Sequence, residues 1–167
     1  MTSTYLLDAL FTAPRTRFED IQKLQADQGI YGWFEDGKLV YVGKSKSQKE
    51  GKTHNRLVNR LLEHATGNSC VSSFVNYLRT KRYLSVQAAD MEKYPYLEPV
   101  KVEEKKIVSY MSKHLEIVVI ECDPAQLLED ASCKPEDFLF THCDTLTEIK
   151  LWNNATGRSK KAEKKLK

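Results

Sequence analysis

The feature that most constrains the fold is a pair of aromatic and β-branched runs on either side of an Asp-Gly pair. The first run is Gly-Ile-Tyr-Gly-Trp-Phe (29–34) and the second is Lys-Leu-Val-Tyr-Val-Gly (38–43), with Glu35, Asp36 and Gly37 between them. Two runs of this composition around Asp-Gly are typical of a β-hairpin. The chain is therefore expected to contain an antiparallel pair of strands in this region.

The length of the hairpin turn decides where its two tyrosines, Tyr31 and Tyr41, lie. A two-residue Asp-Gly turn (36–37) pairs Tyr31 with Val42 and places the tyrosines on opposite faces, because side chains alternate along a strand. A three-residue turn (35–37) with a left-handed glycine pairs Tyr31 directly with Tyr41. We predict the three-residue turn, because only that register presents both phenols to one site.

The rest of the chain predicts helices around this hairpin. Residues 1–28 are expected to form a helical extension with two apolar stripes separated by Pro14. Apolar periodicity predicts further helices at about 53–65, 72–78, 103–114 and 146–152, with an irregular stretch at 84–100. The content of β-branched residues predicts a strand at 115–121. The fold class is α+β, with a small three-stranded, mainly antiparallel sheet of hairpin plus later strand, flanked by helices. Residues 29–156 form the main domain, with a helical insertion at about 66–115.

The positive charge of the chain is concentrated at its C-terminal end. The formal net charge is +3, and the basic tail at 157–167 holds six Lys or Arg residues against one Glu, or +5, which leaves −2 for the remainder. Such a tail adds phosphate contacts that are independent of nucleic-acid sequence and weaken with salt. Specific recognition of a nucleic acid has to come from the folded part.

Composition and cysteine usage indicate a cytoplasmic protein that does not enter a membrane. No window approaches 18 consecutive apolar residues, and the first residues do not resemble a secretory signal. The cysteines at 70, 122, 133 and 143 form no C-x-x-C pair and are expected to be free thiols. A zinc site built from Cys133, His142 and Cys143 lacks ligands paired at zinc-finger spacing, so no metal is assigned there.

The helix that follows the hairpin carries Arg56, Arg60 and His64 at intervals of four residues. They lie along one side of the helix, beside the leucine stripe that faces the sheet, and can therefore overhang Tyr31 and Tyr41. A guanidinium can oppose the charge that develops on a phosphate during phosphodiester cleavage, and Arg60 is our candidate, with Arg56 as its competitor. A phenol can position or deprotonate water, and a histidine can move a proton near neutral pH, which suits Tyr31 and His64.

Together these motifs resemble the signature of the GIY-YIG nuclease family. Gly-Ile-Tyr (29–31), then Tyr-Val-Gly (41–43) followed by Lys44, is similar to the GIY and YIG elements, and Arg-Leu-Leu-Glu-His (60–64) matches the R-x-x-x-H of the family's first helix. The resemblance covers about 29–156. It implies a metal-dependent endonuclease that hydrolyses phosphodiester bonds in DNA, with Tyr31, Tyr41, Arg60 and His64 as catalytic residues and Lys44 and Arg56 as contacts to the DNA backbone.

The resemblance also implies one Mg²⁺ or Mn²⁺ ion, held by a glutamate on a later helix, because Mg²⁺ prefers carboxylate and water oxygens. Glu148 opens a segment similar to the family's E-x-x-L-I, so it is the expected metal ligand and catalytic carboxylate. Asn153 is similar to a family asparagine that contacts the substrate, but it follows Glu148 too closely for the family spacing. If Asn153 is the correct match, the ligand is Glu136 or Glu129 instead.

Two other functions are compatible with parts of the sequence. Gly-Lys-Ser (43–45) is similar to the end of a phosphate-binding loop, but Lys38 stands where that motif needs glycine and the next helix begins too late, so no nucleotide cofactor is expected. The alternative is a catalytically inactive module of the same fold that binds DNA or a protein partner. Its contacts would come from the basic tail and from the lysines at 44, 46, 49 and 52.

Overall fold

The computed structural model describes residues 3–45, 56–69 and 72–122, and it has an α+β fold. The helices are α1 (Ser3–Thr12), α2 (Arg56–Ala65), α3 (Ser73–Lys81), α4 (Ala88–Lys93) and α5 (Pro99–His114), with a short 3-10 helix η1 (Phe18–Lys23). The strands are β1 (Thr16–Arg17), β2 (Gly29–Glu35), β3 (Lys38–Ser45) and β4 (Leu115–Glu121). The hairpin and the later strand thus form where the sequence patterns predict them.

The sheet has four strands in the order β1-β4-β2-β3, all antiparallel, instead of the expected three. The additional strand is β1, in which Thr16 pairs with Ile117 and Arg17 pairs with Glu116. The N-terminal extension, expected to be helical throughout, therefore contributes to the sheet after Pro14. A strand of two residues is too short to show an alternating pattern, which is why the sequence does not indicate it.

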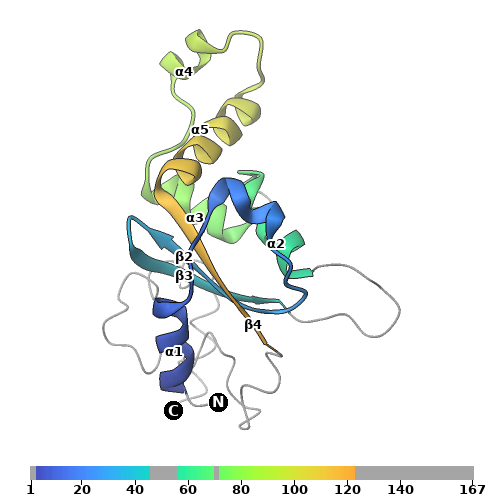
Figure 1. Ribbon diagram of the computed structural model, residues 1–167. Helices are drawn as coiled ribbons and strands as arrows, with labels where there is room; N and C mark the ends of the chain where they lie inside the picture. Colours follow the sequence, from blue (N-terminus) through green and yellow to red (C-terminus); the bar gives the residue numbers. More distant parts are fainter. Residues whose placement is uncertain (1–2, 46–55, 70–71, 123–167) are drawn as a thin grey trace, which may run out of the picture.

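Helices cover both faces of the sheet, with α1 on one side and α2, α3 and α5 on the other (Figure 1). On the α1 side, Leu10 packs against Ile30, Phe34 and neighbouring apolar residues of the sheet. The larger core lies on the other side, where the rings of β2 and β3 meet apolar residues of α2, α3 and α5. Every residue of the central strand β2 is buried, because that strand has partners on both edges and helices on both faces. No helix in the described ranges is long and apolar enough to cross a membrane.

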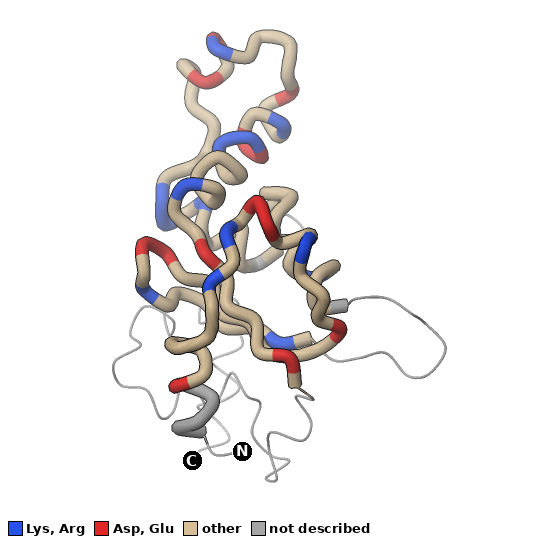
Figure 2. Tube along the Cα trace, in the orientation of Figure 1, with Lys and Arg blue, Asp and Glu red and all other residues tan. Residues whose placement is uncertain are grey.

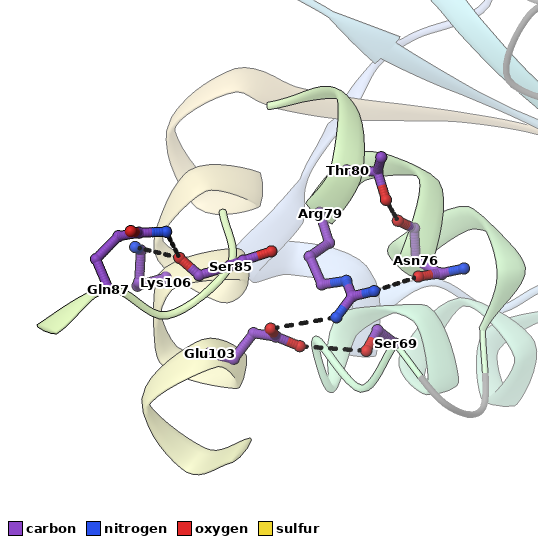
Figure 3. A network of polar contacts seen from close by, with 8 residues as sticks. All are labelled: Ser69, Asn76, Arg79, Thr80, Ser85, Gln87, Glu103 and Lys106. Atoms are coloured by element: carbon purple, nitrogen blue, oxygen red, sulfur yellow. Dashed lines mark hydrogen bonds and ion pairs between the residues drawn. The ribbon is translucent and has the colours of Figure 1, made fainter. Parts of the chain in front are cut away.

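An arm formed by α4 and the first turns of α5 extends away from the sheet (Figure 1). Glu103 of α5 connects this arm to the rest of the protein, because it accepts hydrogen bonds from Arg79 Nη1 at 3.4 Å and from Ser69 Oγ at 3.3 Å (Figure 3). Lys106 Nζ, also on α5, donates to the Ser85 carbonyl at 3.0 Å. The segment before α5, expected to be irregular, includes α4. Basic and acidic residues are interspersed along the arm (Figure 2).

Candidate active site

The hairpin turn has two residues, and the predicted three-residue turn is wrong. Glu35 pairs with Lys38, and between them Asp36 and Gly37 both have positive φ values, 47° and 85°. Two successive positive φ values are typical of the type I′ turns that connect tight hairpins. Glu35 is thus the last residue of β2, with its side chain directed into the protein.

A β-bulge brings Tyr41 back to the face of the sheet that carries Tyr31. The register shifts beyond Trp33, which pairs with Tyr41, so that Val40 is an extra residue of β3. Tyr31 consequently pairs with Gly43, and the two tyrosine rings lie on one face with their centroids 6.3 Å apart. The prediction that both phenols share a face is confirmed, although the two residues are not paired directly.

Gly43 allows the ring of Tyr31 to pass across β3. A Cβ atom on Gly43 would overlap both the ring and the hydroxyl oxygen of Tyr31. Glycine has no such atom, so the phenol passes close to Gly43 and its hydroxyl contacts His64 of α2. The glycine of the Tyr-Val-Gly motif therefore positions the tyrosine of the Gly-Ile-Tyr motif.

Helix α2 directs His64 into the core and leaves Arg60 at its edge. The leucine stripe of α2 and His64 are fully buried, whereas the Arg60 side chain is 35% exposed and donates to Glu63 Oε2 at 2.6 Å. Burial by itself would lower the pKa of Arg60, but hydrogen bonds and charge interactions with Glu63 and with the Tyr31 phenol outweigh it and raise the pKa. Arg60 is thus a permanent cation beside the Tyr31 hydroxyl.

His64 is a neutral, fully buried imidazole that contacts the Tyr31 hydroxyl. Its Nε2 atom lies 3.1 Å from Tyr31 Oη. Burial, with a smaller contribution from Arg60, lowers the pKa of His64 to about 3. The ring is enclosed by aromatic side chains, namely Trp33, Tyr41 and Phe74. Because an imidazole with this pKa stays neutral around pH 7, His64 does not fit the expected role of a group that gains and loses a proton near neutral pH.

Ser72 completes this buried network, and sequence reasoning missed it. Its Oγ lies 2.6 Å from His64 Nδ1 and also accepts a hydrogen bond from the Val75 backbone N–H at 3.2 Å, which caps α3. A serine before an apolar helical run is recognisable as an N-cap in the sequence. Nothing in the local pattern indicates that the same hydroxyl contacts a histidine on another helix.

Among the other sequence candidates, Lys44 is the one that the structure describes and places away from this point. Lys44 pairs with Ile30 and therefore lies on the opposite face of the sheet from Tyr31, while Arg56 is the first residue of α2 and its side chain is not among those described. The remaining candidates lie outside the described residues: Glu148, Asn153, Glu136, Glu129, Cys133, His142 and Cys143. The described part of the site thus consists of Tyr31, Tyr41, Arg60, His64 and Ser72.

The side chains described at the site do not by themselves suit a magnesium ion. Within residues 3–45, 56–69 and 72–122 there is no group of three or more His, Cys, Asp or Glu side chains placed to hold a metal. The Glu63 carboxylate beside the site is already bound by Arg60. Because Mg²⁺ prefers carboxylate and water oxygens, phenol, imidazole and guanidinium groups do not provide a set of ligands for it.

A second buried polar cluster lies at the hairpin end of the same sheet face, and the sequence did not indicate it. The carboxylate of Glu35, which is 6% exposed, is held by two bonds from Arg82 and accepts a third from Tyr110 Oη at 2.8 Å. Burial, together with the bond to Glu35, raises the pKa of Tyr110 to about 12. This cluster pairs its buried charge internally.

Comparisons of the chain with protein-family models, with curated proteins and with solved structures find no match. The function of the chain is therefore inferred from its sequence motifs and from the geometry of the residues around Tyr31.

Proposed function

We propose that the chain is a metal-dependent endonuclease, similar to the GIY-YIG nucleases, that hydrolyses phosphodiester bonds in DNA. The observation that carries this proposal is the convergence of Tyr31, His64 and Arg60 at one edge of the sheet. A buried tyrosine that only packs needs one hydrogen-bond partner for its hydroxyl. The Tyr31 hydroxyl instead meets both a neutral imidazole and a partly exposed cation.

Arg60 is the member of this group that a phosphate approaching from solvent would meet first. Its guanidinium can bind two phosphate oxygens at once and oppose the negative charge that develops as phosphorus becomes five-coordinate. In its ionised form, Tyr31 would take a proton from the attacking water as the water oxygen bonds to phosphorus, and the leaving oxygen would take a proton from solvent as its bond to phosphorus breaks. Tyr31 is 1% exposed, so the proposal requires that water enters beside Arg60 when DNA binds.

The remaining parts of the proposed mechanism come from the sequence alone. Glu148 would hold the Mg²⁺ or Mn²⁺ ion, whose charge would help to neutralise the phosphate. Asn153 and Arg56 would contact the DNA. Lys44 lies on the other face of the sheet, so any contact that it makes to the DNA backbone would be separate from the tyrosine pair.

Nicking of supercoiled plasmid in Mg²⁺ or Mn²⁺ tests the proposal directly. Arg60→Ala should reduce the nicking rate by about 100-fold or more, the usual effect of removing a group that stabilises transition-state charge. Arg17→Ala is the matched control. Arg17, like Arg60, forms an ion pair with a glutamate close to it in sequence, Glu19, but Arg17 is exposed and lies outside the proposed site. Equal nicking by wild type and Arg60→Ala would defeat the assignment of Arg60.

The choice between an enzyme and a binding module depends on the metal ligand. Nicking that disappears in Glu148→Ala, but persists in Glu136→Ala and Glu129→Ala, supports the enzyme with Glu148 as the ligand. Salt-sensitive DNA binding with no cleavage in either metal supports the alternative, a module that binds DNA without cutting it.

A further inference from the structure

The Ser72 hydroxyl lies between two groups that compete for its hydrogen-bonding capacity. A serine hydroxyl has one proton to donate and two lone pairs that accept. One lone pair of Ser72 Oγ is used by the Val75 N–H at 3.2 Å, and the second contact is with His64 Nδ1 at 2.6 Å. Either the serine donates to the imidazole or the imidazole donates to the serine.

The two arrangements differ in which hydroxyl, that of Ser72 or that of Tyr31, needs an acceptor other than His64. If His64 Nδ1–H donated, the Ser72 proton would need another acceptor, and in the described part of the chain Oγ contacts only Val75 N and His64 Nδ1. Ser72 is 1% exposed, so that proton would stay unsatisfied at a cost of about 1–3 kcal/mol. If Ser72 donates to Nδ1, its proton, the Val75 N–H and His64 Nδ1 are all satisfied, and the proton that needs another acceptor is that of the Tyr31 hydroxyl, beside the partly exposed Arg60 where the proposed site meets solvent.

The direction of this bond determines whether the imidazole nitrogen that faces Tyr31 carries a proton. A neutral imidazole has one N–H, and an Nδ1 that accepts from Ser72 leaves that proton on Nε2. Nε2 is the atom that lies 3.1 Å from Tyr31 Oη. His64 therefore faces the phenol as a donor, with the Arg60 guanidinium as a second donor nearby.

We propose that Ser72 is a positioning residue, whose hydroxyl holds His64 in the Nε2–H tautomer and thereby directs a hydrogen-bond donor at the oxygen of Tyr31. Donors directed at a phenol oxygen favour its ionised form, which is the form that can take a proton from water. In the described residues, the charged or titratable groups that face Tyr31 are Arg60 and His64 of α2 and Tyr41 of β3. This consequence for catalysis rests on the proposed function, whereas the tautomer itself does not.

Nitrogen-15 NMR of histidine-labelled protein reads the tautomer without any substrate. Long-range proton–nitrogen spectra should show the His64 proton on Nε2 in the wild type and in Ser72→Thr, which keeps a hydroxyl at the N-cap. In Ser72→Ala and Ser72→Gly the Nδ1 proton should become populated. A wild-type protein with the proton on Nδ1 would overturn the proposal without reference to any variant. An unchanged Nε2–H tautomer in a folded Ser72→Ala or Ser72→Gly protein would overturn it as well.

The same variants separate this proposal from the proposed nuclease. Ser72→Gly is the second substitution because glycine is a tolerated N-cap and costs only a few tenths of a kcal/mol, so loss of the cap is not confused with loss of the donor. The pH at which Tyr31 ionises, followed by carbon-13 NMR of its ring, should be higher in Ser72→Gly than in wild type. Ser72→Thr should restore the wild-type midpoint, and no difference between wild type and Ser72→Gly would contradict the role of the donor.

Plasmid nicking then tests the link to catalysis. The rising limb of the pH–rate profile should move to higher pH in Ser72→Gly, with a loss of about tenfold at neutral pH, and Ser72→Thr should recover it. The predicted tautomer with no nicking in any metal would reject the nuclease and leave the positioning role intact. Nicking by a wild-type protein with an Nδ1–H histidine would do the reverse.

Discussion

Two buried polar clusters lie on the same face of the sheet and differ in where their charged groups lie and what pairs them. At the hairpin end, the anionic Glu35 is matched inside the protein by Arg82 and by the phenol of Tyr110. At the other end, the hydroxyls of Tyr31 and Ser72 contact the neutral imidazole of His64, and the cation Arg60 lies at the rim with 35% of its side chain exposed.

The difference separates a structural network from one that can receive a ligand. A buried carboxylate held by a bidentate guanidinium has no capacity left for a new partner, and removal of either member leaves an uncompensated charge. Arg60, at the rim of the network around His64, is instead paired with the solvent-exposed carboxylate of Glu63 and can exchange that partner for an incoming anion. The comparison predicts large stability effects at Glu35 and small ones at Arg60.

The largest stability effect is expected at the hairpin end. Glu35→Ala should lower the free energy of unfolding by about 3 kcal/mol or more, because it leaves Arg82 and Tyr110 without their acceptor. Urea unfolding measures this, with Glu116→Ala as the control, since Glu116 is also a sheet carboxylate paired with an arginine, Arg15, but at the surface. Similar losses in both variants would mean that the buried Glu35 pair stabilises the fold no more than the surface Glu116 pair does.

The next effect is a pH dependence that belongs to the Tyr31 end. Burial lowers the pKa of His64 from its ordinary 6.5 to about 3, so the unfolded chain binds the proton first as the pH falls. The stabilisation that neutral His64 gives the folded state is complete above pH 6.5 and is lost as the pH falls from 6.5 to 3. Between pH 7 and pH 5 the loss is about 2 kcal/mol of unfolding free energy. His64→Gln should remove this slope, whereas His114→Gln, at a partly exposed position, should retain it. A slope that survives in His64→Gln would show that other groups cause it.

A third prediction concerns the passage of Tyr31 over β3. Gly43→Ala should cost about 1–3 kcal/mol of unfolding free energy, because the added methyl group overlaps the phenol. In a Tyr31→Ala background the same substitution should cost clearly less, since the overlapping ring is gone. A double-mutant cycle in urea measures this coupling, and additive costs would contradict the close approach of the two residues.

The smallest stability effect is expected at Arg60. Arg60→Ala should change the free energy of unfolding by less than about 1 kcal/mol, because its ion pair with Glu63 is exposed to solvent. Arg82→Ala provides the comparison and should cost distinctly more. An Arg60→Ala protein that is destabilised as strongly as Arg82→Ala would place both arginines in structural roles, and its loss of nicking would then no longer identify a functional group.

Local patterns predicted the hairpin, the helix that carries Arg60 and His64, and the later strand, because each has a period or composition of its own. They did not predict the turn length, since Glu35 could belong either to the turn or to the strand. Arg82, 47 positions away in sequence, binds Glu35 and stabilises its buried place in the strand. A contact of that range leaves no signal in the hairpin itself.

The same limit applies to the site. The shared face of Tyr31 and Tyr41 was predicted correctly, but through a register that the protein does not use. Ser72 is visible in the sequence as a helix cap, yet its contact with His64 depends on how α2 and α3 fold back on each other. Glu148 and Asn153 lie outside the described residues, so their roles stay predictions.

The bulge at Val40 also determines which changes of length the hairpin can accept over evolution. Deletion of Val40 would leave Tyr41 opposite Trp33 in a regular two-residue hairpin and so keep it on the face of Tyr31, whereas a regular ladder that retained Val40 would place Tyr41 on the opposite face. Relatives of this chain that keep both phenols together should therefore either carry the bulge at this spacing or lack it at a spacing that is one residue shorter.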